Sequence, residues 1–232
     1  MTRRRLLRGP LVAGACLTVL AAAGCASPPP TFSVVTPNPN PTSTYANRMR
    51  IVTIGDSIMS GYGLDVGEAW PVLLANKAHV SLTNLACGGM GFIAVGDCGT
   101  PYSGFVPALA ALQPDVAIVQ SSSNDFDEDP ATLHAATVST VQEIHEAAPD
   151  AMIIGLSTIW NDEEETPDEV GTTSTDLRDA IALVGGEFLD VGQPLAGHPN
   201  WMQEDDVHPT YRGQQAIEEA VHAKLEDAGV LP

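Results

Sequence analysis

The chain has 232 residues, of which 29 are Asp or Glu and 10 are Lys or Arg, and its formal net charge at pH 7 is −19. This balance excludes a nucleic-acid-binding protein and a protein that adheres to anionic lipid through a basic patch, because both need clustered positive charge. The length suits one domain with a substantial core, once the N-terminal segments are set apart.

Residues 1–25 have the pattern of an export signal. A basic start precedes an apolar run at 11–23, which is too short to span a bilayer at about 1.5 Å per residue. The stretch "TRRRLLR" resembles a twin-arginine signal, and export through Sec is the alternative. The stretch "AAGC" resembles a bacterial lipobox, with Ala22 in place of the usual Leu. We expect an exported, cell-surface lipoprotein anchored at Cys25; the alternatives are a secreted protein and an uncleaved anchor.

Residues 26–47 are expected to form a tether, and residues 48–232 to form the folded domain. The tether segment is rich in Pro, Ser, Thr and Asn and carries little apolar surface to bury. Such a composition favours an extended, semi-rigid linker that holds the domain away from a membrane surface.

Two cysteines, Cys87 and Cys98, remain in the domain. An exported chain leaves the reducing cytosol, so we expect a disulfide between them. No metal site is expected there, since no nearby His or Cys completes a tetrahedral set. The acidic run 161–169 lacks the Gly-punctuated spacing of a calcium loop, and we expect it to be a solvated loop.

Short β-branched runs alternate with helix-like segments along the domain. Strands are predicted at 50–55, 80–86, 115–120, 151–157 and 187–192. Helices are predicted at 68–78, 106–114, 130–150 and 211–229, the third stopping at Pro149 and the last at Gly229. This alternation predicts an α/β fold with a mostly parallel five-stranded sheet that is covered on both faces. Ligands in such sheets bind beyond the carboxyl ends of the strands, so functional residues should follow strands.

The first candidate is Ser57, in "TIGDSIMSGYG" after the first predicted strand. A serine at a helix N-terminus lies beside free N–H groups and the positive end of the helix dipole, which favour an oxyanion. The alternative is that Ser57 only caps the helix. A phosphate loop is excluded because no Gly-Lys-Ser/Thr follows.

The second candidate is the pair Asp205 and His208 in "EDDVHPTYRG". At a spacing of three residues a carboxylate can hold and polarise an imidazole, and a nucleophilic serine needs such an oriented base. The other histidines are weaker candidates, because they lie in predicted helices or lack an acid at useful spacing. They are His79, His134, His145, His198 and His222.

Two further segments follow strands. "NLACGGMG" at 84–91 is a glycine-rich turn whose backbone N–H groups could point into a site, and Asn124 in "SSSNDFDED" could donate its amide to an oxyanion. The serines beside Asn124 have no acid–histidine pair of their own. We therefore do not expect them to be the nucleophile.

In this order, "GDS", a glycine turn, "ND" and "DxxH" resemble the SGNH (GDSL-type) hydrolase family over residues 50 to about 213. The resemblance implies a flavodoxin-like α/β/α sandwich that hydrolyses esters without a cofactor. It implies Ser57 as the nucleophile, His208 as general base and then acid, and Asp205 as the residue that orients it. The oxyanion hole would comprise the backbone N–H of Ser57, the N–H of Gly89, and the side-chain amide of Asn124. If the register is off by one, Gly88 replaces Gly89.

One position departs from the family pattern. Ser122 stands where the third block usually has glycine, in Gly-x-Asn-Asp. A serine disfavours positive φ and adds a hydroxyl, so we expect an intact catalytic set with a modified pocket wall.

We expect an exported carboxylic ester hydrolase that acts on a small-molecule or glycan ester, with short-chain or O-acetyl esters favoured because no long apolar lid is present. The alternatives are an acyltransferase on cell-wall or extracellular glycans and a catalytically weak surface binding module. Trp160 follows the fourth strand and could stack on a sugar or pack at the edge of the core. No nucleic acid is expected as a partner, the only membrane contact would be an N-terminal lipid anchor, and the protein should be a monomer.

Overall fold

The computed structural model describes residues 48–231. The predicted export signal, the lipidation candidate Cys25 and the tether lie outside the described residues. Within residues 48–231, no helix is long and apolar enough to cross a membrane.

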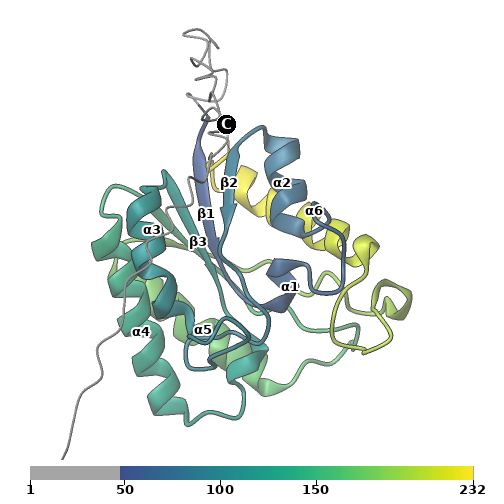
Figure 1. Ribbon diagram of the computed structural model, residues 1–232. Coiled ribbons are helices and arrows are strands. Elements are labelled where there is room, and N and C mark those ends of the chain that lie inside the picture. Colours follow the sequence, from purple (N-terminus) through teal and green to yellow (C-terminus); the bar gives the residue numbers. More distant parts are fainter. Residues whose placement is uncertain (1–47, 232) are drawn as a thin grey trace, which may run out of the picture. The chain divides into compact units, whose positions relative to one another are not determined.

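The core of the domain is a five-stranded sheet in which every neighbouring pair is parallel (Figure 1). Its strands are β1 Arg50–Ile54, β2 Ser81–Asn84, β3 Val116–Gln120, β4 Met152–Leu156 and β5 Glu187–Leu189, and their order in the sheet is β2-β1-β3-β4-β5. All five predicted strands are confirmed, each somewhat shorter than its apolar run. The order changes direction at β1, so the loops after β1 and β3 diverge and leave room for a site between them.

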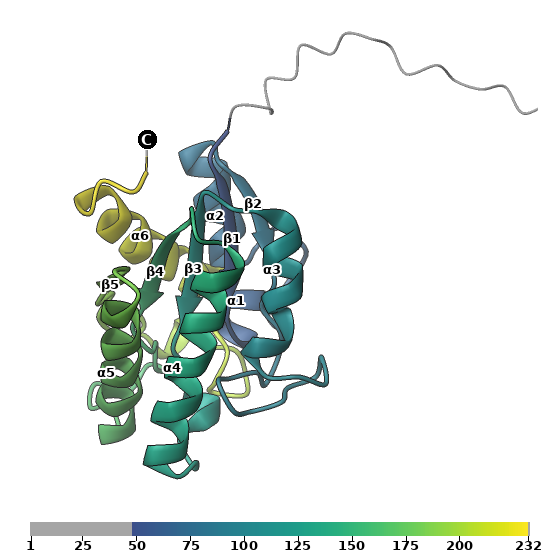
Figure 2. The ribbon, with the colours of Figure 1, turned by 90° about the vertical axis from the view of Figure 1, so that its left-hand side faces the viewer.

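Helices cover both faces of the sheet, which confirms the three-layer α/β/α sandwich (Figures 1 and 2). One face carries α2 Trp70–Ala78 and α6 Tyr211–Asp227, and the other carries α3 Val106–Leu112, α4 Pro130–Ala147 and α5 Asp168–Leu183. The predicted helices are present, and α6 ends two residues before Gly229.

Helix α5 is missing from the sequence prediction. Its segment contains Gly171 and a Thr/Ser run, which have low helix propensity and hide the helical period. In the structure the hydroxyls of this run donate to backbone carbonyls one turn earlier, as Ser174 Oγ does to the carbonyl of Val170 at 2.6 Å. The helix takes the last two acidic residues of the run 161–169 into its first turn, where they favour the positive end of the dipole. Glu163 to Thr166 are exposed, as expected of a solvated loop.

Alternate residues of the central strands face the two helical layers. On β3, Val116 and Ile118 pack with the residues of α2 and α6, whereas Ala117 and Val119 pack with those of α3, α4 and α5. Both faces are buried, which explains why the strands read as continuous apolar runs.

Short helical turns lie in the segments that follow the carboxyl ends of the strands. They are α1 Ser57–Ser60 after β1, η1 Tyr102–Phe105 before α3, η2 Ser123–Asp125 after β3 and η3 Pro199–Trp201 before α6. In Figure 1, α1 lies just beyond the carboxyl end of β1, whereas the C-terminus of α6 lies toward the opposite ends of the strands.

Candidate active site

Ser57 is the first residue of α1, and Asp56 is the residue that caps this helix. The carboxylate of Asp56 accepts the N–H of Ile58 at 2.9 Å and of Met59 at 3.4 Å. The alternative that Ser57 itself caps the helix is therefore wrong. The side chain and N–H of Ser57 have no hydrogen-bond partner within residues 48–231, and the residue is 8% exposed. A hydroxyl and an N–H are thus free at the positive end of α1.

Two amide side chains hold this four-residue helix in place. Gln214 of α6 donates to the carbonyl of Ile58 at 2.8 Å, and Asn84 at the end of β2 donates to the carbonyl of Met59 at 2.9 Å. The last carbonyls of a helix lack a full set of intrahelical partners, and the only backbone bond to the carbonyl of Ile58 among the described residues is a long one of 3.3 Å from the N–H of Gly61, so the two amides complete the hydrogen bonding at this end of α1. They fix the nucleophile candidate Ser57 relative to the sheet and α6.

Asp205 and His208 form the predicted pair. Oδ2 of Asp205 lies 2.6 Å from Nδ1 of His208, while its Oδ1 accepts the backbone N–H of His208 at 3.0 Å and of Val207 at 3.1 Å. The backbone N–H and then the imidazole of His208 lower the pKa of Asp205 from 3.8 to about 2. The carboxylate therefore stays ionised, and it fixes the ring so that Nε2 is left for another partner.

Tyr62 joins α1 to the loop that carries His208. Its N–H donates to the carbonyl of Ser57 at 3.0 Å, and its ring centroid lies 4.3 Å from that of His208. Gln203, in the loop that carries His208, donates to the carbonyl of Tyr62 at 2.7 Å. These contacts bring Ser57 and His208 to the same edge of the sheet. Within residues 48–231 the two side chains are not hydrogen-bonded to each other; such bonds often tighten only when substrate binds.

The predicted oxyanion donors lie on the neighbouring loops. Gly89 has φ +69, a conformation that favours glycine, and its N–H has no acceptor within residues 48–231. Nδ2 of Asn124 donates to the carbonyl of Met90 at 3.0 Å. This bond uses one of the two N–H groups of the amide and leaves the other for a ligand. The glycine turn and Asn124 are thus tied together through Met90.

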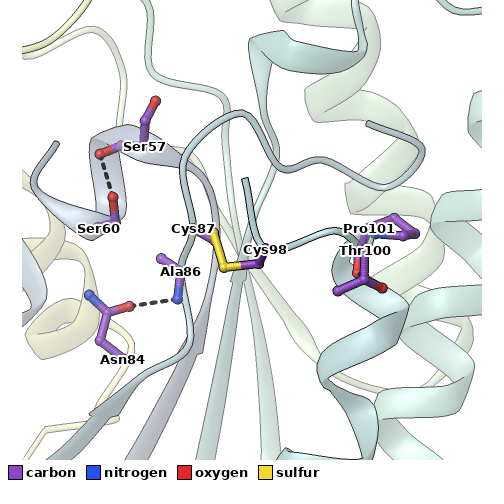
Figure 3. The surroundings of a disulfide bond; sticks show 8 residues. All are labelled: Ser57, Ser60, Asn84, Ala86, Cys87, Cys98, Thr100 and Pro101. Carbon is purple, nitrogen blue, oxygen red and sulfur yellow. Dashed lines mark hydrogen bonds between the residues drawn. A yellow bond between two sulfur atoms is a disulfide. The ribbon is translucent and has the colours of Figure 1, made fainter. Parts of the chain in front are cut away.

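The glycine turn is fixed by the predicted disulfide between Cys87 and Cys98, which is confirmed (Figure 3). The two Cα atoms are 6.2 Å apart. The N–H of Cys87 donates to the carbonyl of Gly55 at 3.1 Å, which ties the turn to the end of β1. Figure 3 shows the disulfide on the loop after β2, with Ser57 on the neighbouring helix α1. No group of three or more His, Cys, Asp or Glu suited to a metal occurs among the described residues.

Asp125 is a buried anchor for the loop that follows the glycine turn. The residue is 1% exposed, and its carboxylate accepts the N–H of Phe92 at 2.7 Å, of Ile93 at 3.1 Å and of Ala94 at 2.9 Å. The two residues of the "ND" motif thus make separate contacts: Asn124 bonds to the carbonyl of Met90, and Asp125 fixes the neighbouring loop.

Ser122 is not part of a pocket wall, so that expectation is wrong. Its side chain is 1% exposed, and its hydroxyl donates to Oδ2 of Asp56 at 2.6 Å. Its φ is −127, which is extended backbone, so the position has no need of glycine.

A small pocket of about 30 Å³ is lined in part by Ile58 and Val207, the chain neighbours of Ser57 and His208. Its lining residues are Ile58, Ser123, Ile159, Trp160, Asn161, Asp206 and Val207. The ring of Trp160 stacks against Phe126 with centroids 5.5 Å apart, and its Nε1 donates to Glu163 at 3.1 Å. Trp160 therefore packs as a wall of this pocket, with one face already covered by an aromatic ring.

Four residues that hold the site together were not predicted from the sequence: Asp56, Tyr62, Gln203 and Gln214. Asp56 could have been found, since an aspartate directly before a predicted helix is a common cap. Nothing in the sequence signals the contact of Tyr62 with His208 or the bond of Gln214 to α1, because both join segments far apart in the chain.

Residues 53–216 match the GDSL-like lipase/acylhydrolase family. The chain belongs to this family. Among solved structures, a crystal structure of TesA is 23% identical, with a TM-score of 0.62, over 77% of this chain and 99% of that one. The esterase EstA from Pseudoalteromonas sp. is 18% identical, with a TM-score of 0.61, over 77% and 97% of the two chains.

A family two carbohydrate esterase from Cellvibrio japonicus is also similar, at 18% identity and a TM-score of 0.62, over 77% of this chain and 61% of that one. At these identities the structural likeness supports the fold. A search of curated protein sequences finds no match.

Proposed function

We propose that this chain is a serine ester hydrolase that cleaves short-chain or O-acetyl carboxylic esters through an acyl-serine intermediate. The observation that carries the proposal is the 2.6 Å contact between Asp205 and His208, at the same edge of the sheet as a serine whose hydroxyl has no other partner in the described chain. An oriented imidazole beside a free serine hydroxyl suits acyl transfer.

Acylation begins when Oγ of Ser57 attacks the ester carbonyl carbon and Nε2 of His208 takes the hydroxyl proton. The carbonyl oxygen becomes an oxyanion, for which the N–H of Ser57, the N–H of Gly89 and the free N–H of the Asn124 amide are the donors. The C–O bond to the alcohol then breaks, and the imidazolium gives its proton to the leaving oxygen. The charge of Asp205 stabilises the imidazolium in between, and its pKa of about 2 keeps that charge present at any pH where the imidazole can act as a base.

Deacylation repeats these steps with water in place of serine. His208 takes a proton from water as the water oxygen attacks the acyl carbon, and the same donors hold the oxyanion. The bond to Oγ of Ser57 breaks, the proton returns to that oxygen, and the free acid leaves. No metal or redox group takes part in this scheme.

The small pocket supports a short acyl group. Its volume of about 30 Å³ holds roughly one or two groups of the size of water or methyl. Its apolar side, formed by Ile58, Ile159 and Val207, suits the methyl of an acetyl group and leaves little room for a long chain. Trp160 forms a further wall, and Phe126 stacks against it.

A panel of p-nitrophenyl esters tests the proposal. The wild-type protein should hydrolyse the acetate, and kcat/KM should fall from butyrate to octanoate. Val207→Ala and Ile159→Ala should move the preference to longer chains, because each enlarges the pocket. A rise in kcat/KM with chain length would refute the short-chain assignment. Equal rates for wild type and Ser57→Ala would refute the proposal that the chain is a serine esterase and would favour a binding module.

Export and a lipid anchor at Cys25 belong to the same proposal. The N-terminal sequence supports both, and the disulfide between Cys87 and Cys98 supports export, since disulfides persist in oxidising compartments. Mass spectrometry of the protein made in a bacterium with lipoprotein processing should find an N-terminal lipidated cysteine. An unmodified N-terminus after a signal cleavage would favour the secreted form.

A further inference from the structure

The hydroxyl of Ser122 lies between two parts of the candidate active site. It donates to Oδ2 of Asp56 at 2.6 Å and accepts the backbone N–H of Asn124 at 3.1 Å. An N–H can only donate, so the hydroxyl must be the acceptor toward Asn124 and its single proton must point at the carboxylate. Both bonds are thus used in one defined orientation.

Each partner leads directly to a group that the proposed reaction needs. The other carboxylate oxygen of Asp56 accepts two N–H groups of α1, the helix that begins with Ser57. Asn124 carries the side-chain amide predicted for the oxyanion hole, already oriented by the carbonyl of Met90. A continuous set of hydrogen bonds therefore runs from the nucleophile helix, through Asp56 and Ser122, to the oxyanion donor.

We infer that Ser122 is a positioning residue for ester hydrolysis, one that fixes the distance between Ser57 and the Asn124 amide through its bonds to Asp56 and to the backbone of Asn124. The inference rests on the proposed function. Glycine, the usual residue of the family here, has no hydroxyl and can make neither bond. This chain has therefore gained a link at a position where the family pattern has none.

Burial makes the link more important. Asp56 is 5% exposed, and burial raises its pKa above the usual value. Several interactions lower this pKa again. The hydrogen bond from Ser122 is the largest of them, followed by the N–H bonds from α1 and the charge of His208. Tyr102 and Asp125 also face this cluster: burial first, and then the charges of Asp56 and Asp125, raise the pKa of Tyr102 well above 10, so Tyr102 is neutral. Without the hydroxyl of Ser122, Asp56 binds a proton at a higher pH than in the wild type.

The adjacent serine provides a matched control. Ser121 is 2% exposed, as buried as Ser122, but within residues 48–231 its hydroxyl has no hydrogen-bond partner. Ser121→Ala and Ser122→Ala therefore remove the same atom from equally buried neighbours, and only the second breaks the link. Ser122→Gly is the second variant, since the extended backbone at Ser122 and the family pattern both accept glycine.

The test measures kcat, KM and the pH dependence of kcat for p-nitrophenyl acetate on the full-length protein, with melting temperatures as the check on folding. Ser122→Ala and Ser122→Gly should lower kcat by about 10- to 100-fold with KM within about threefold, because misplacing reacting groups has effects of that size. Because Asp56 binds a proton at a higher pH in both variants, their kcat relative to wild type should fall further as the pH is lowered. Ser121→Ala should keep kcat within about twofold of wild type at every pH.

A double-mutant cycle identifies the group through which Ser122 acts. In an Asn124→Ala background the amide is gone, so Ser122→Ala should have little further effect on kcat. Three results would each overturn the inference while the wild type remains an active esterase. They are a full effect of Ser122→Ala in the Asn124→Ala background, a kcat of Ser122→Gly at or above the wild-type value, and equal effects of Ser121→Ala and Ser122→Ala. If wild type and Ser57→Ala hydrolyse the ester equally slowly, the proposed function fails, and the inference fails with it.

Discussion

Replacing Asp125 by asparagine tests whether the buried carboxylate holds the loop beside the glycine turn. Its Oδ1 accepts the N–H groups of Ile93 and Ala94, and its Oδ2 accepts that of Phe92. The asparagine side chain has nearly the same shape, but only one of its two terminal atoms can accept a hydrogen bond. In its best orientation the amide oxygen keeps the hydrogen bonds from the N–H groups of Ile93 and Ala94, and the amide NH₂ faces the N–H of Phe92.

The expected loss of stability follows from these three bonds. A hydrogen bond to a charged group contributes about 1.5–3 kcal/mol against about 0.5–1.5 for a neutral pair, so two retained bonds lose about 1 kcal/mol each. The N–H of Phe92 is left buried without an acceptor, at a further cost of about 1–3 kcal/mol. The free energy of unfolding should therefore fall by about 3–5 kcal/mol. In a domain of this size that corresponds to a drop of roughly 6–20 °C in Tm.

Thermal unfolding followed by far-ultraviolet circular dichroism measures this drop. Asp127→Asn is the matched control, because Asp127 is an exposed neighbour with no hydrogen bond to a described residue; its Tm should stay within about 1 °C of wild type. A decrease of less than about 2 °C for Asp125→Asn would refute the claim that the three N–H groups depend on this carboxylate.

Asn124→Ala should lower kcat for p-nitrophenyl acetate by about 10²–10³-fold with little change in KM, as loss of one oxyanion donor does, and a change below about threefold would remove Asn124 from the site. Replacing both cysteines, Cys87→Ser and Cys98→Ser, should lower the free energy of unfolding by about 2–3 kcal/mol, as measured by urea denaturation. The reduced wild-type protein should be as stable as this double variant. Equal stability of the oxidised and reduced wild-type protein would contradict the prediction. The pKa of Asp205 is about 2 in the folded chain and 3.8 ordinarily, so the carboxylate favours the folded state above about pH 4 and loses that effect as the pH falls toward 2. The wild type should therefore have a higher Tm than Asp205→Asn near pH 6, and this difference should shrink as the pH approaches 2. A difference that grows in acid would contradict the contact between Asp205 and His208 as its cause.

Most of the fold could be predicted because each central strand is buried on both faces and reads as an apolar run. Helix α5 could not, since the Thr/Ser run at its centre obscured a buried stripe that includes Val170, Leu177 and Ile181. Its hydroxyls bond back to its own carbonyls, so residues that usually favour loops are accommodated within a helix.

The candidate site shows the same division. Ser57, Asn124 and the Asp205–His208 pair lie beyond strands or in short local motifs, so position along the chain was enough to propose them as candidates. The role of Ser122 could not be predicted, because it depends on a 2.6 Å contact with Asp56 across two loops. The sequence showed that this position departs from the family pattern; only the side-chain packing shows that the hydroxyl points inward and not into the pocket.

Covalent labelling with a serine-directed phosphonate tests the central claim, that Ser57 is the nucleophile, most directly. The reagent should add one phosphonyl group per chain, peptide mass spectrometry should place it on Ser57, and hydrolysis of p-nitrophenyl acetate should disappear in step with labelling. Ser57→Ala should take up no label. Labelling on Ser121, Ser122 or Ser123, or full esterase activity in the Ser57→Ala variant, would contradict the account.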